Sequence, residues 1–296
     1  CNGILAISNT NSIHSGIDAV KVFTEGMSIQ VQGIHINEVQ KGKDAVIQGI
    51  RKGYSAGKQV FVIDAVTEEN LAVIRDATLA MEEKIILCGS AGLAKQLSLL
   101  EVGRAQPVES NVPQESGITL VLIGSYNACT AEQVQILAAE TGMPMLALFS
   151  GDILQGTYNH THEELLQQAD ALVSGGCKLL AVVVDTLLPG FTAANNGKTN
   201  VIRDSQSITN AMGSLARQLC DRYKVSAIIS SGGDTSLAVL KALHANGIEL
   251  DAEIVPGVPA GRLIGGMADG IRIVTKSGGF GQKDCLVRTI EYLNKE

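Results

Sequence analysis

Two apolar segments in the last third of the chain each end in a glycine-rich turn. Residues 227–230 run into SGGDT at 231–235, and residues 271–275 run into KSGGFG at 276–281. An amphipathic segment follows each turn, so both stretches predict a strand, a tight turn and a helix. Turns without side chains let backbone N–H groups approach an anion, and the helix dipole favours negative charge there. Two such turns, the second with Lys276, favour phosphate binding and a purely structural role about equally.

Strand and helix patterns alternate along all 296 residues, and no Asn-Gly hairpin signal separates the strands. We therefore expect an α/β protein of two domains, each with a mostly parallel sheet flanked by helices. The polar, proline-containing residues 102–117 are the expected linker, which places the domains at residues 1–101 and 118–296. Ligands of such sheets bind at the carboxyl ends of the strands. That edge should gather three turns: Gly124-Ser125, SGGDT and KSGGFG.

Charge and cysteine usage exclude several kinds of partner. A formal charge of −7 and a pI near 5.3 argue against nucleic acid or an anionic membrane surface as the main partner. No apolar run has the length of a membrane span. The six cysteines show no C-x-x-C spacing, which is typical of reduced thiols in a cytoplasmic protein. We expect a cytoplasmic protein whose anion site is local and built largely from backbone groups.

The NGKT segment at 196–199 resembles the end of a P-loop. A P-loop also needs a glycine, four residues ahead of its Gly-Lys-Thr, that turns the chain around the phosphate. Thr192 takes that place here. We therefore expect a surface loop at this point and assign no nucleotide site to it.

Asp234, inside the SGGDT turn, has two interpretations. It could cap a helix by accepting from the first backbone N–H groups. Alternatively, it lies beside bound phosphate, where a carboxylate is repelled unless Mg²⁺ lies between them or the carboxylate accepts a proton from an attacking hydroxyl. Both interpretations stay open, and Asp234 is the candidate catalytic residue.

The motif SGGDT, the PGVP element at 256–259 and KSGGFG, in this order and spacing, resemble the C-terminal domain of the four-carbon acid sugar kinases. Gly124-Ser125 followed by Thr130 and Gln133 is similar to the start of that domain, and VIDA at 62–65 and CGSAGLA at 88–94 are similar to part of the N-terminal domain. The resemblance covers most of residues 55–290. It implies ATP-dependent phosphorylation, with Mg²⁺, of a tetronate or 3-oxo-tetronate. It also implies that the acid sugar binds mainly to the N-terminal domain, with transfer in the interdomain cleft.

The turns and the resemblance together give a set of candidate nucleotide ligands. By the resemblance, the nucleotide contacts fall on Ser125, on residues 232–235 and on the turn at 278–279. Gly279 is expected to bring its backbone to the phosphate, with a positive φ as a further reason for glycine. No side chain is assigned as a metal ligand. The full candidate set is Gly124, Ser125, Gly232, Gly233, Asp234, Thr235, Lys276, Gly278, Gly279 and Gly281.

The sequence departs from the family pattern in its N-terminal part. Two family segments are absent, an opening Asp-Asp-Leu-Thr-Gly-Ala and a later Lys-Ile-Asp-Ser-Thr-Leu-Arg-Gly-Asn, and Asn11 stands where an arginine is usual. We expect that the sequence omits stretches and joins their ends near residues 26 and 27, which leaves the acid-sugar domain incomplete. The alternative is a non-catalytic nucleotide- or metabolite-binding protein that lost its acid site. The identity of the acid, its reacting hydroxyl and the oligomeric state, a homo-oligomer included, are left open.

Overall fold

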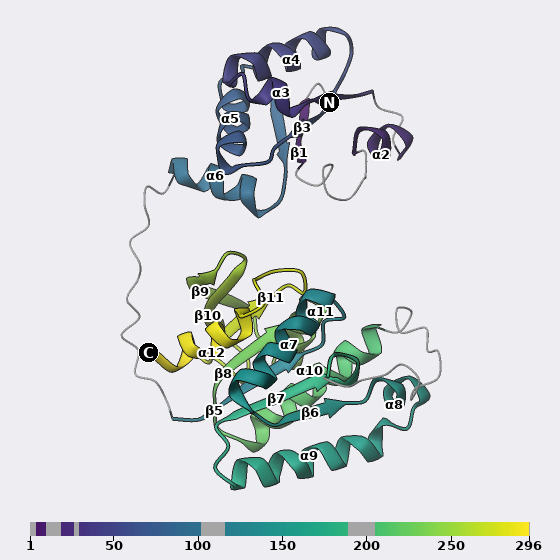
Figure 1. The fold of residues 1–296 in the computed structure, drawn as a ribbon, viewed down its shortest axis with the longest axis vertical. Helices are drawn as coiled ribbons and strands as arrows, with labels where there is room; N and C mark the ends of the chain where they lie inside the picture. The colour runs from purple at the N-terminus through teal and green to yellow at the C-terminus, as the bar shows by residue number, and fades with distance from the viewer. Residues whose placement is uncertain (1–3, 10–18, 27–29, 102–115, 189–204, 296) are drawn as a thin grey trace. The chain divides into compact units, whose positions relative to one another are not determined.

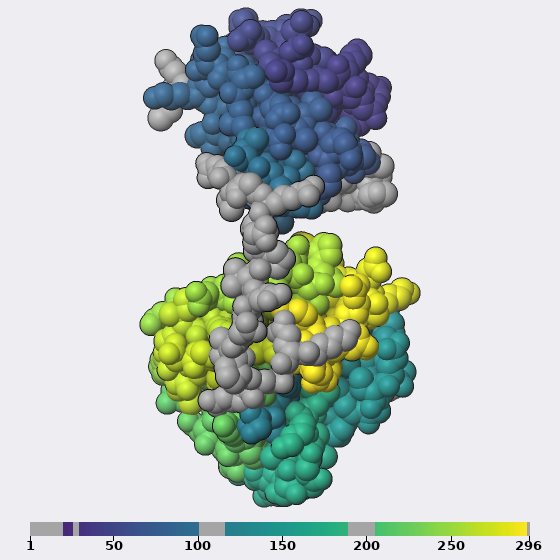
Figure 2. Space-filling view, turned by 90° about the vertical axis from the view of Figure 1, so that its left-hand side faces the viewer, coloured from purple at the N-terminus to yellow at the C-terminus, as the bar shows by residue number. Residues whose placement is uncertain are grey.

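The computed structural model describes residues 4–9, 19–26, 30–101, 116–188 and 205–295. The chain divides into two units, Cys1–Gln106 and Pro107–Glu296, coloured purple to blue and teal to yellow (Figures 1 and 2). Asn11, most of the expected linker and the NGKT segment lie outside the described residues. Within the described ranges, no helix combines the length and the apolar character that a membrane span requires.

The first unit is built on a parallel sheet, which among the described residues has the strand order β2-β3-β1-β4. Its central strand β3 has four buried residues out of five, as expected for a parallel strand covered on both faces. The strands are β1 (Ile4–Asn9), β2 (Val31–Ile34), β3 (Val60–Asp64) and β4 (Ile85–Cys88). The helices are α2 (Ala19–Gly26), α3 (Ile36–Val39), α4 (Lys43–Ser55), α5 (Glu68–Leu79) and α6 (Ala91–Glu101).

The second unit contains a larger sheet with the order β6-β7-β5-β8-β11-β10-β9. Its strands are β5 (Ile118–Ile123), β6 (Met145–Leu148), β7 (Leu179–Val184), β8 (Val225–Ser231), β9 (Gly247–Val255), β10 (Val258–Ile264) and β11 (Arg272–Lys276). Its helices are α7 (Ala128–Thr141), α8 (Ser150–Gln155), α9 (Tyr158–Ser174), α10 (Ser205–Arg222), α11 (Gly233–Ala242) and α12 (Cys285–Lys295). The predicted α/β class, with mostly parallel sheets in two units, is confirmed.

Helices cover both faces of this larger sheet, so its central strands are buried on both sides. Apolar residues of α9, α10 and α11 pack with one set of strand side chains, and residues of α7 and α12 pack with the alternate set. Such a sheet requires nearly continuous apolar strands. Residues 179–184 read Leu-Leu-Ala-Val-Val-Val and meet that requirement.

The expectation that no hairpin interrupts the alternation is wrong. β9 and β10 pair antiparallel, and β10 pairs antiparallel with β11. Pro256 and Gly257 form the turn between β9 and β10, with Gly257 at φ +80°. Proline before a glycine of positive φ is the type II turn pattern. An added Cβ at Gly257 would overlap the Phe280 ring, so this hairpin lies against the KSGGFG turn.

A close contact between α10 and α11 leads to a stability prediction. A Cβ on Gly213 would come within 2.7 Å of the Ala238 carbonyl oxygen. Gly213→Ala should therefore lower the free energy of unfolding by about 1–2 kcal/mol, because overpacking costs about 1–3 kcal/mol and exceeds the helix-propensity gain of about 1 kcal/mol. Urea denaturation measures the change. Gly233→Ala, where nothing lies within 4 Å of the added Cβ, is the control and should cause no such loss.

Candidate functional site

The strands β5, β8 and β11 are parallel neighbours whose carboxyl ends lie level. The sheet register pairs Ile123 with Ser231, and Ser231 with Lys276. The interstrand hydrogen bonds continue one residue beyond the strands. Gly124 N–H donates to the Ser231 oxygen (3.1 Å), and Gly232 N–H donates to the Lys276 oxygen (2.8 Å). The structure thus brings the three predicted turns together at one edge of the sheet.

The chain leaves β5 and β8 in opposite directions. After β5 it crosses through α7 to β6, and after β8 it crosses through α11 toward the β9–β11 side. The two helices also lie on opposite faces, since α7 packs with α12 and α11 packs with α10. The crevice between β5 and β8 is therefore a topological switch point, the usual ligand position in an open α/β sheet.

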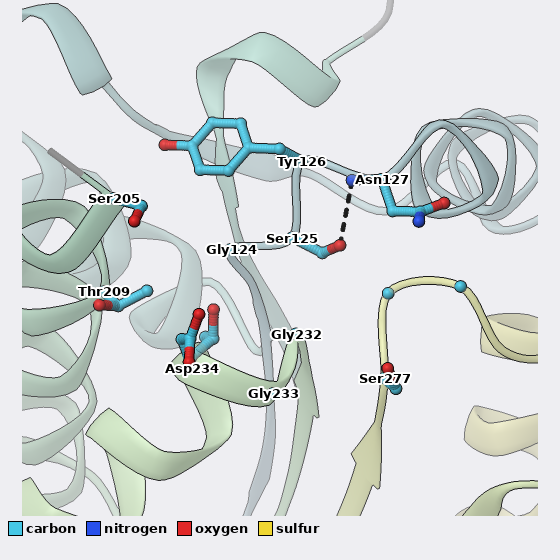
Figure 3. Close-up of a pocket in the computed structure, with 13 residues that line it drawn as sticks. Gly124, Ser125, Tyr126, Asn127, Ser205, Thr209, Gly232, Gly233, Asp234 and Ser277 are labelled. Atoms are coloured by element: carbon cyan, nitrogen blue, oxygen red, sulfur yellow. Dashed lines mark hydrogen bonds between the residues drawn. The ribbon is translucent and has the colours of Figure 1, made fainter. Parts of the chain in front are cut away.

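A pocket of about 240 Å³ occupies this position (Figure 3). The turn after β5, the first two turns of α10, the SGGDT turn and the KSGGFG turn contribute to its wall. All predicted ligands line it except Lys276 and Gly281. The lining residues are Gly124, Ser125, Tyr126, Asn127, Ser205, Thr209, Gly232, Gly233, Asp234, Thr235, Ser277, Gly278 and Gly279.

At two of the glycines an added side chain would meet neighbouring residues of the turn after β5. Gly232 has a φ of +114°, and an added Cβ would lie 3.3 Å from Ser125 N. At Gly278 an added Cβ would overlap Ser125 Oγ and lie 3.0 Å from Asn127 Cβ. Gly279 differs, because its φ is not among the positive values and its Cβ would meet only Asn127 Nδ2, at 3.6 Å. The expectation of a positive φ at Gly279 is therefore wrong, although its backbone does line the pocket.

The first turn of α11 offers backbone N–H groups to the pocket. Gly232 is its N-cap and supplies no side chain, and Asp234 is the second helical residue. The interpretation of Asp234 as the N-cap is therefore wrong. At α7, in contrast, the Asn127 side chain accepts from Cys129 N–H at 2.9 Å. Of the two helices that follow β5 and β8, α11 is therefore the one whose N-terminus no side chain caps, which leaves its N–H groups available to an anion.

Lys276 points into the protein rather than into the pocket. It is 2% exposed, and its Nζ donates to the Ser277 oxygen at 2.8 Å and the Gly278 oxygen at 3.3 Å. Burial lowers the pKa of this ammonium. Gly281 also lies outside the pocket lining, and its oxygen accepts from Gln133 Nε2 at 3.1 Å. These two residues of the KSGGFG turn therefore form hydrogen bonds within the protein and do not line the pocket.

Sequence reasoning missed the residues that α10 contributes. Ser205 and Thr209 are four positions apart in its first turns and so share one helix face. A pair of hydroxyls at that spacing at the start of a long helix was the available signal. Tyr126, Asn127 and Ser277 were also missed, although they directly adjoin predicted residues. Burial, together with the nearby Asp185 charge, raises the pKa of Tyr126, so its phenol stays neutral.

The pocket fits a phosphate-bearing ligand better than a metal ion bound by protein alone. Among the described residues, no group of three or more His, Cys, Asp or Glu side chains could hold a metal ion. Asp234 is the carboxylate in the lining and is exposed. Mg²⁺ in nucleotide sites is commonly held by one or two carboxylates plus the phosphates themselves. The donors present therefore fit Mg²⁺ arriving with a nucleotide.

Glycine turns at a switch point, around an uncapped helix N-terminus, define a phosphate-binding α/β domain. Comparison with known families gives the same result. Residues 120–286 match the model of a nucleotide-binding C-terminal domain, and residues 14–97 match a sugar-binding N-terminal domain. The chain belongs to the four-carbon acid sugar kinase family, which confirms the resemblance seen in its motifs.

Individual relatives agree with this assignment. A D-threonate kinase of Bordetella bronchiseptica is 29% identical over 244 residues, which cover 81% of this chain and 54% of the relative. A 3-oxo-tetronate kinase of Brucella melitensis is 28% identical over 261 residues, which cover 87% of this chain and 57% of the relative. The chain thus spans little more than half the length of these curated relatives. A crystal structure of a Haemophilus influenzae protein shares the fold, with a TM-score of 0.63 and 22% identity over 98% of this chain and 74% of that one.

Proposed function

We propose that the chain binds ATP in the pocket of its second unit and transfers the γ-phosphoryl group to a hydroxyl of a four-carbon acid sugar. The observation that carries this proposal is the convergence of glycine turns and the uncapped N-terminus of α11 around one pocket. Relatives named threonate, erythronate and 3-oxo-tetronate kinases point to the same substrate class.

Backbone groups do most of the binding in this proposal. The N–H groups of the first turn of α11 and of the KSGGFG turn bind the phosphates, and the positive end of the α11 dipole stabilises their charge. Ser205 adds a hydroxyl donor from α10, whereas the Thr209 hydroxyl donates to the Gln206 oxygen of its own helix at 3.0 Å and contributes an acceptor to the pocket wall. Phosphoryl transfer depends mainly on positioning and charge stabilisation, so such a site needs few ionic side chains. When bound, ATP supplies the phosphoryl group.

Asp234 is the proposed catalytic residue. It lies in the pocket lining, beside the backbone groups that would bind phosphate. Its carboxylate can do one of two things there: hold Mg²⁺ next to the phosphates or accept the proton of the attacking hydroxyl. Both roles need the negative charge, and the dependence of ATP affinity on Mg²⁺ distinguishes between them.

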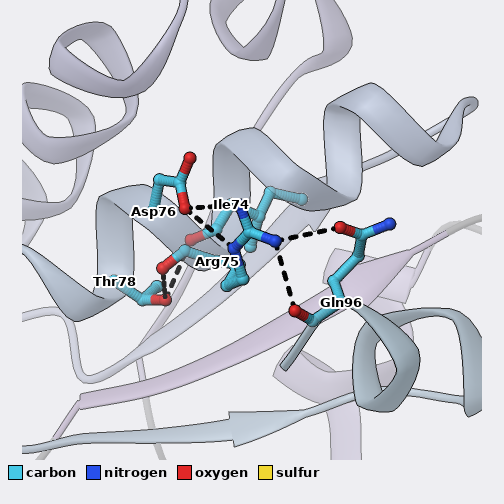
Figure 4. Close-up of polar contacts among 5 residues, drawn as sticks. All are labelled: Ile74, Arg75, Asp76, Thr78 and Gln96. Carbon is cyan, nitrogen blue, oxygen red and sulfur yellow. Dashed lines mark hydrogen bonds and ion pairs between the residues drawn. The ribbon is translucent and has the colours of Figure 1, made fainter. Parts of the chain in front are cut away.

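We assign the acid sugar to the first unit, which carries the sugar-binding match. A polar network fixes α6 against α5 in this unit (Figure 4). Arg75 Nη1 donates to the Gln96 backbone oxygen at 3.2 Å and to its side-chain oxygen at 3.1 Å, while Arg75 Nη2 pairs with Asp76 at 2.7 Å. Gln96 Nε2 donates to Glu68 at 2.7 Å. These bonds link α6 to α5 through Gln96, two residues after the CGSAGLA motif.

A coupled ADP-release assay tests the proposal. ATP and Mg²⁺ are supplied with threonate, erythronate or their 3-oxo forms, and we expect ADP release that depends on at least one of these acids. The non-catalytic alternative instead predicts ATP binding by calorimetry with no acid-dependent ADP release. Absence of ATP binding would contradict the whole proposal.

A further inference from the structure

The carbonyl groups of the KSGGFG turn face inward, toward side chains that do not line the pocket. Lys276 Nζ donates to the oxygens of Ser277 (2.8 Å) and Gly278 (3.3 Å). Thr130 Oγ1, from the first turn of α7, donates to the same Gly278 oxygen at 2.9 Å and lies 3.5 Å from Lys276 Nζ. The two side chains are buried, at 2% and 0% exposure.

Gln133 continues this pattern one helical turn further along α7. Its Nε2 lies within hydrogen-bonding distance of the carbonyl oxygens of Phe280 (3.1 Å), Gly281 (3.1 Å) and Gln282 (2.9 Å), which share its two N–H donors. Its Oε1 is buried and has no hydrogen-bond partner among the described residues. The reverse amide orientation would place Oε1 against three carbonyl oxygens, so the acceptors fix the donor side of the amide toward the turn.

Inward carbonyls determine where the N–H groups point. A trans peptide is planar, and its C=O and N–H point in opposite directions. The Ser277 carbonyl shares a peptide with Gly278 N–H, and the Gly278 carbonyl shares one with Gly279 N–H. Since Lys276 and Thr130 hold both carbonyls inward, both N–H groups point away from them, and Gly278 and Gly279 are the residues of this turn that line the pocket with Ser277.

We propose that Lys276, Thr130 and Gln133 are positioning residues that hold the KSGGFG turn with its N–H groups toward the nucleotide phosphates. The inference rests on the proposed ATP site. Without these donors, peptides of this glycine turn can rotate and bring carbonyl oxygens toward the phosphates, which repel them. Lys276 therefore acts on the nucleotide through the backbone, and not as a direct phosphate ligand.

Thr130 and Lys276 provide the test, with a matched control for each. Thr130→Val removes the hydroxyl at nearly constant shape, and Thr130→Ser retains it. Lys276→Met removes the ammonium, and Lys283→Met does the same at an exposed lysine of the adjoining segment that pairs with Glu132. We expect Thr130→Val and Lys276→Met to raise the Kd for MgATP about tenfold, as loss of one hydrogen bond to a charged or buried group implies. Thr130→Ser and Lys283→Met should stay near wild type.

Hydrogen–deuterium exchange on the nucleotide-free protein supplies a second readout. Residues 277–282 should exchange faster in Thr130→Val and Lys276→Met than in wild type, with the rest of the second unit unchanged. A higher Kd in Lys276→Met together with wild-type behaviour of Thr130→Val in both readouts would overturn the inference in favour of direct phosphate contact. If Lys276→Met does not fold, Thr130→Val decides alone. Wild-type protein that binds no ATP would overturn the proposed function and this inference with it.

Discussion

Asp234→Asn is expected to lower turnover at least about 10²-fold, the lower end of what loss of a general base costs. The amide carries no charge and accepts no proton at working pH, so it can neither attract Mg²⁺ as a carboxylate does nor serve as a base. Turnover is measured by acid-dependent ADP release under saturating ATP.

The same substitution should leave the fold nearly unchanged. Asp234 is exposed and is the second residue of α11, behind the Gly232 cap, so its contribution to stability is limited to an interaction with the helix dipole. Asp44 is the matched control, because it is the exposed second residue of α4 behind the Gly42 cap in the other unit. Asp44→Asn should show the same small change in Tm and no change in turnover.

The dependence of ATP affinity on Mg²⁺ separates the two roles of Asp234. If the carboxylate holds the metal, Asp234→Asn weakens MgATP binding and reduces the benefit of adding Mg²⁺. If the carboxylate is the base, ATP affinity stays near wild type while turnover falls. A folded Asp234→Asn protein with near-normal turnover would contradict both roles.

Gly279→Val is expected to weaken ATP binding on the order of 10²-fold, because one or two hydrogen bonds to a charged phosphate are lost at about 1.5–3 kcal/mol each. The branched side chain stands where the backbone should meet the phosphate. The protein should still fold, since the added Cβ meets only Asn127 Nδ2, at 3.6 Å, and φ is not positive. Calorimetry with MgATP measures the affinity.

Gly247→Val is the control for this change. It lies in β9, outside the pocket lining, and its Cβ would meet only Ile264 Cδ1, at 3.9 Å. ATP affinity should therefore be unaffected. Unchanged ATP binding by a folded Gly279→Val protein would remove the KSGGFG turn from the nucleotide site.

The sequence allowed the position of the pocket to be predicted because its turns follow apolar runs of parallel strands. Gly124, Gly232 and Gly278 each come directly after or near the end of such a run, and parallel strands end at a common edge. The cap of α11 was not predictable in the same way. Gly232 and Asp234 are both acceptable N-cap residues, and only the helix start at Gly233 separates them.

The direction of Lys276 could not be predicted from the sequence. A lysine next to glycines in a phosphate-type turn suggests a ligand, whereas its inward direction depends on the carbonyls of Ser277 and Gly278 in its own turn and on Thr130 of α7. The β9–β10 hairpin could have been predicted from the sequence. Residues 248–254 alternate apolar and polar, except for Ala252, and Pro256-Gly257 follows them. Residues 31–39 show no hydrophobic period, yet they form β2 and α3, because the neighbouring strand β3 and helices α4 and α5 provide the core against which they pack.

The central claim is that backbone N–H groups of the glycine turns bind the ATP phosphates. The most direct measurement is a titration of isotope-labelled protein with MgATP, followed by backbone amide signals in ¹H–¹⁵N spectra. We predict that the largest shifts occur at Gly233, Gly278 and Gly279, with smaller shifts elsewhere in the second unit. Unshifted glycine amides in a protein that binds ATP, with the largest changes instead at the NGKT segment, would contradict the account and restore a P-loop site.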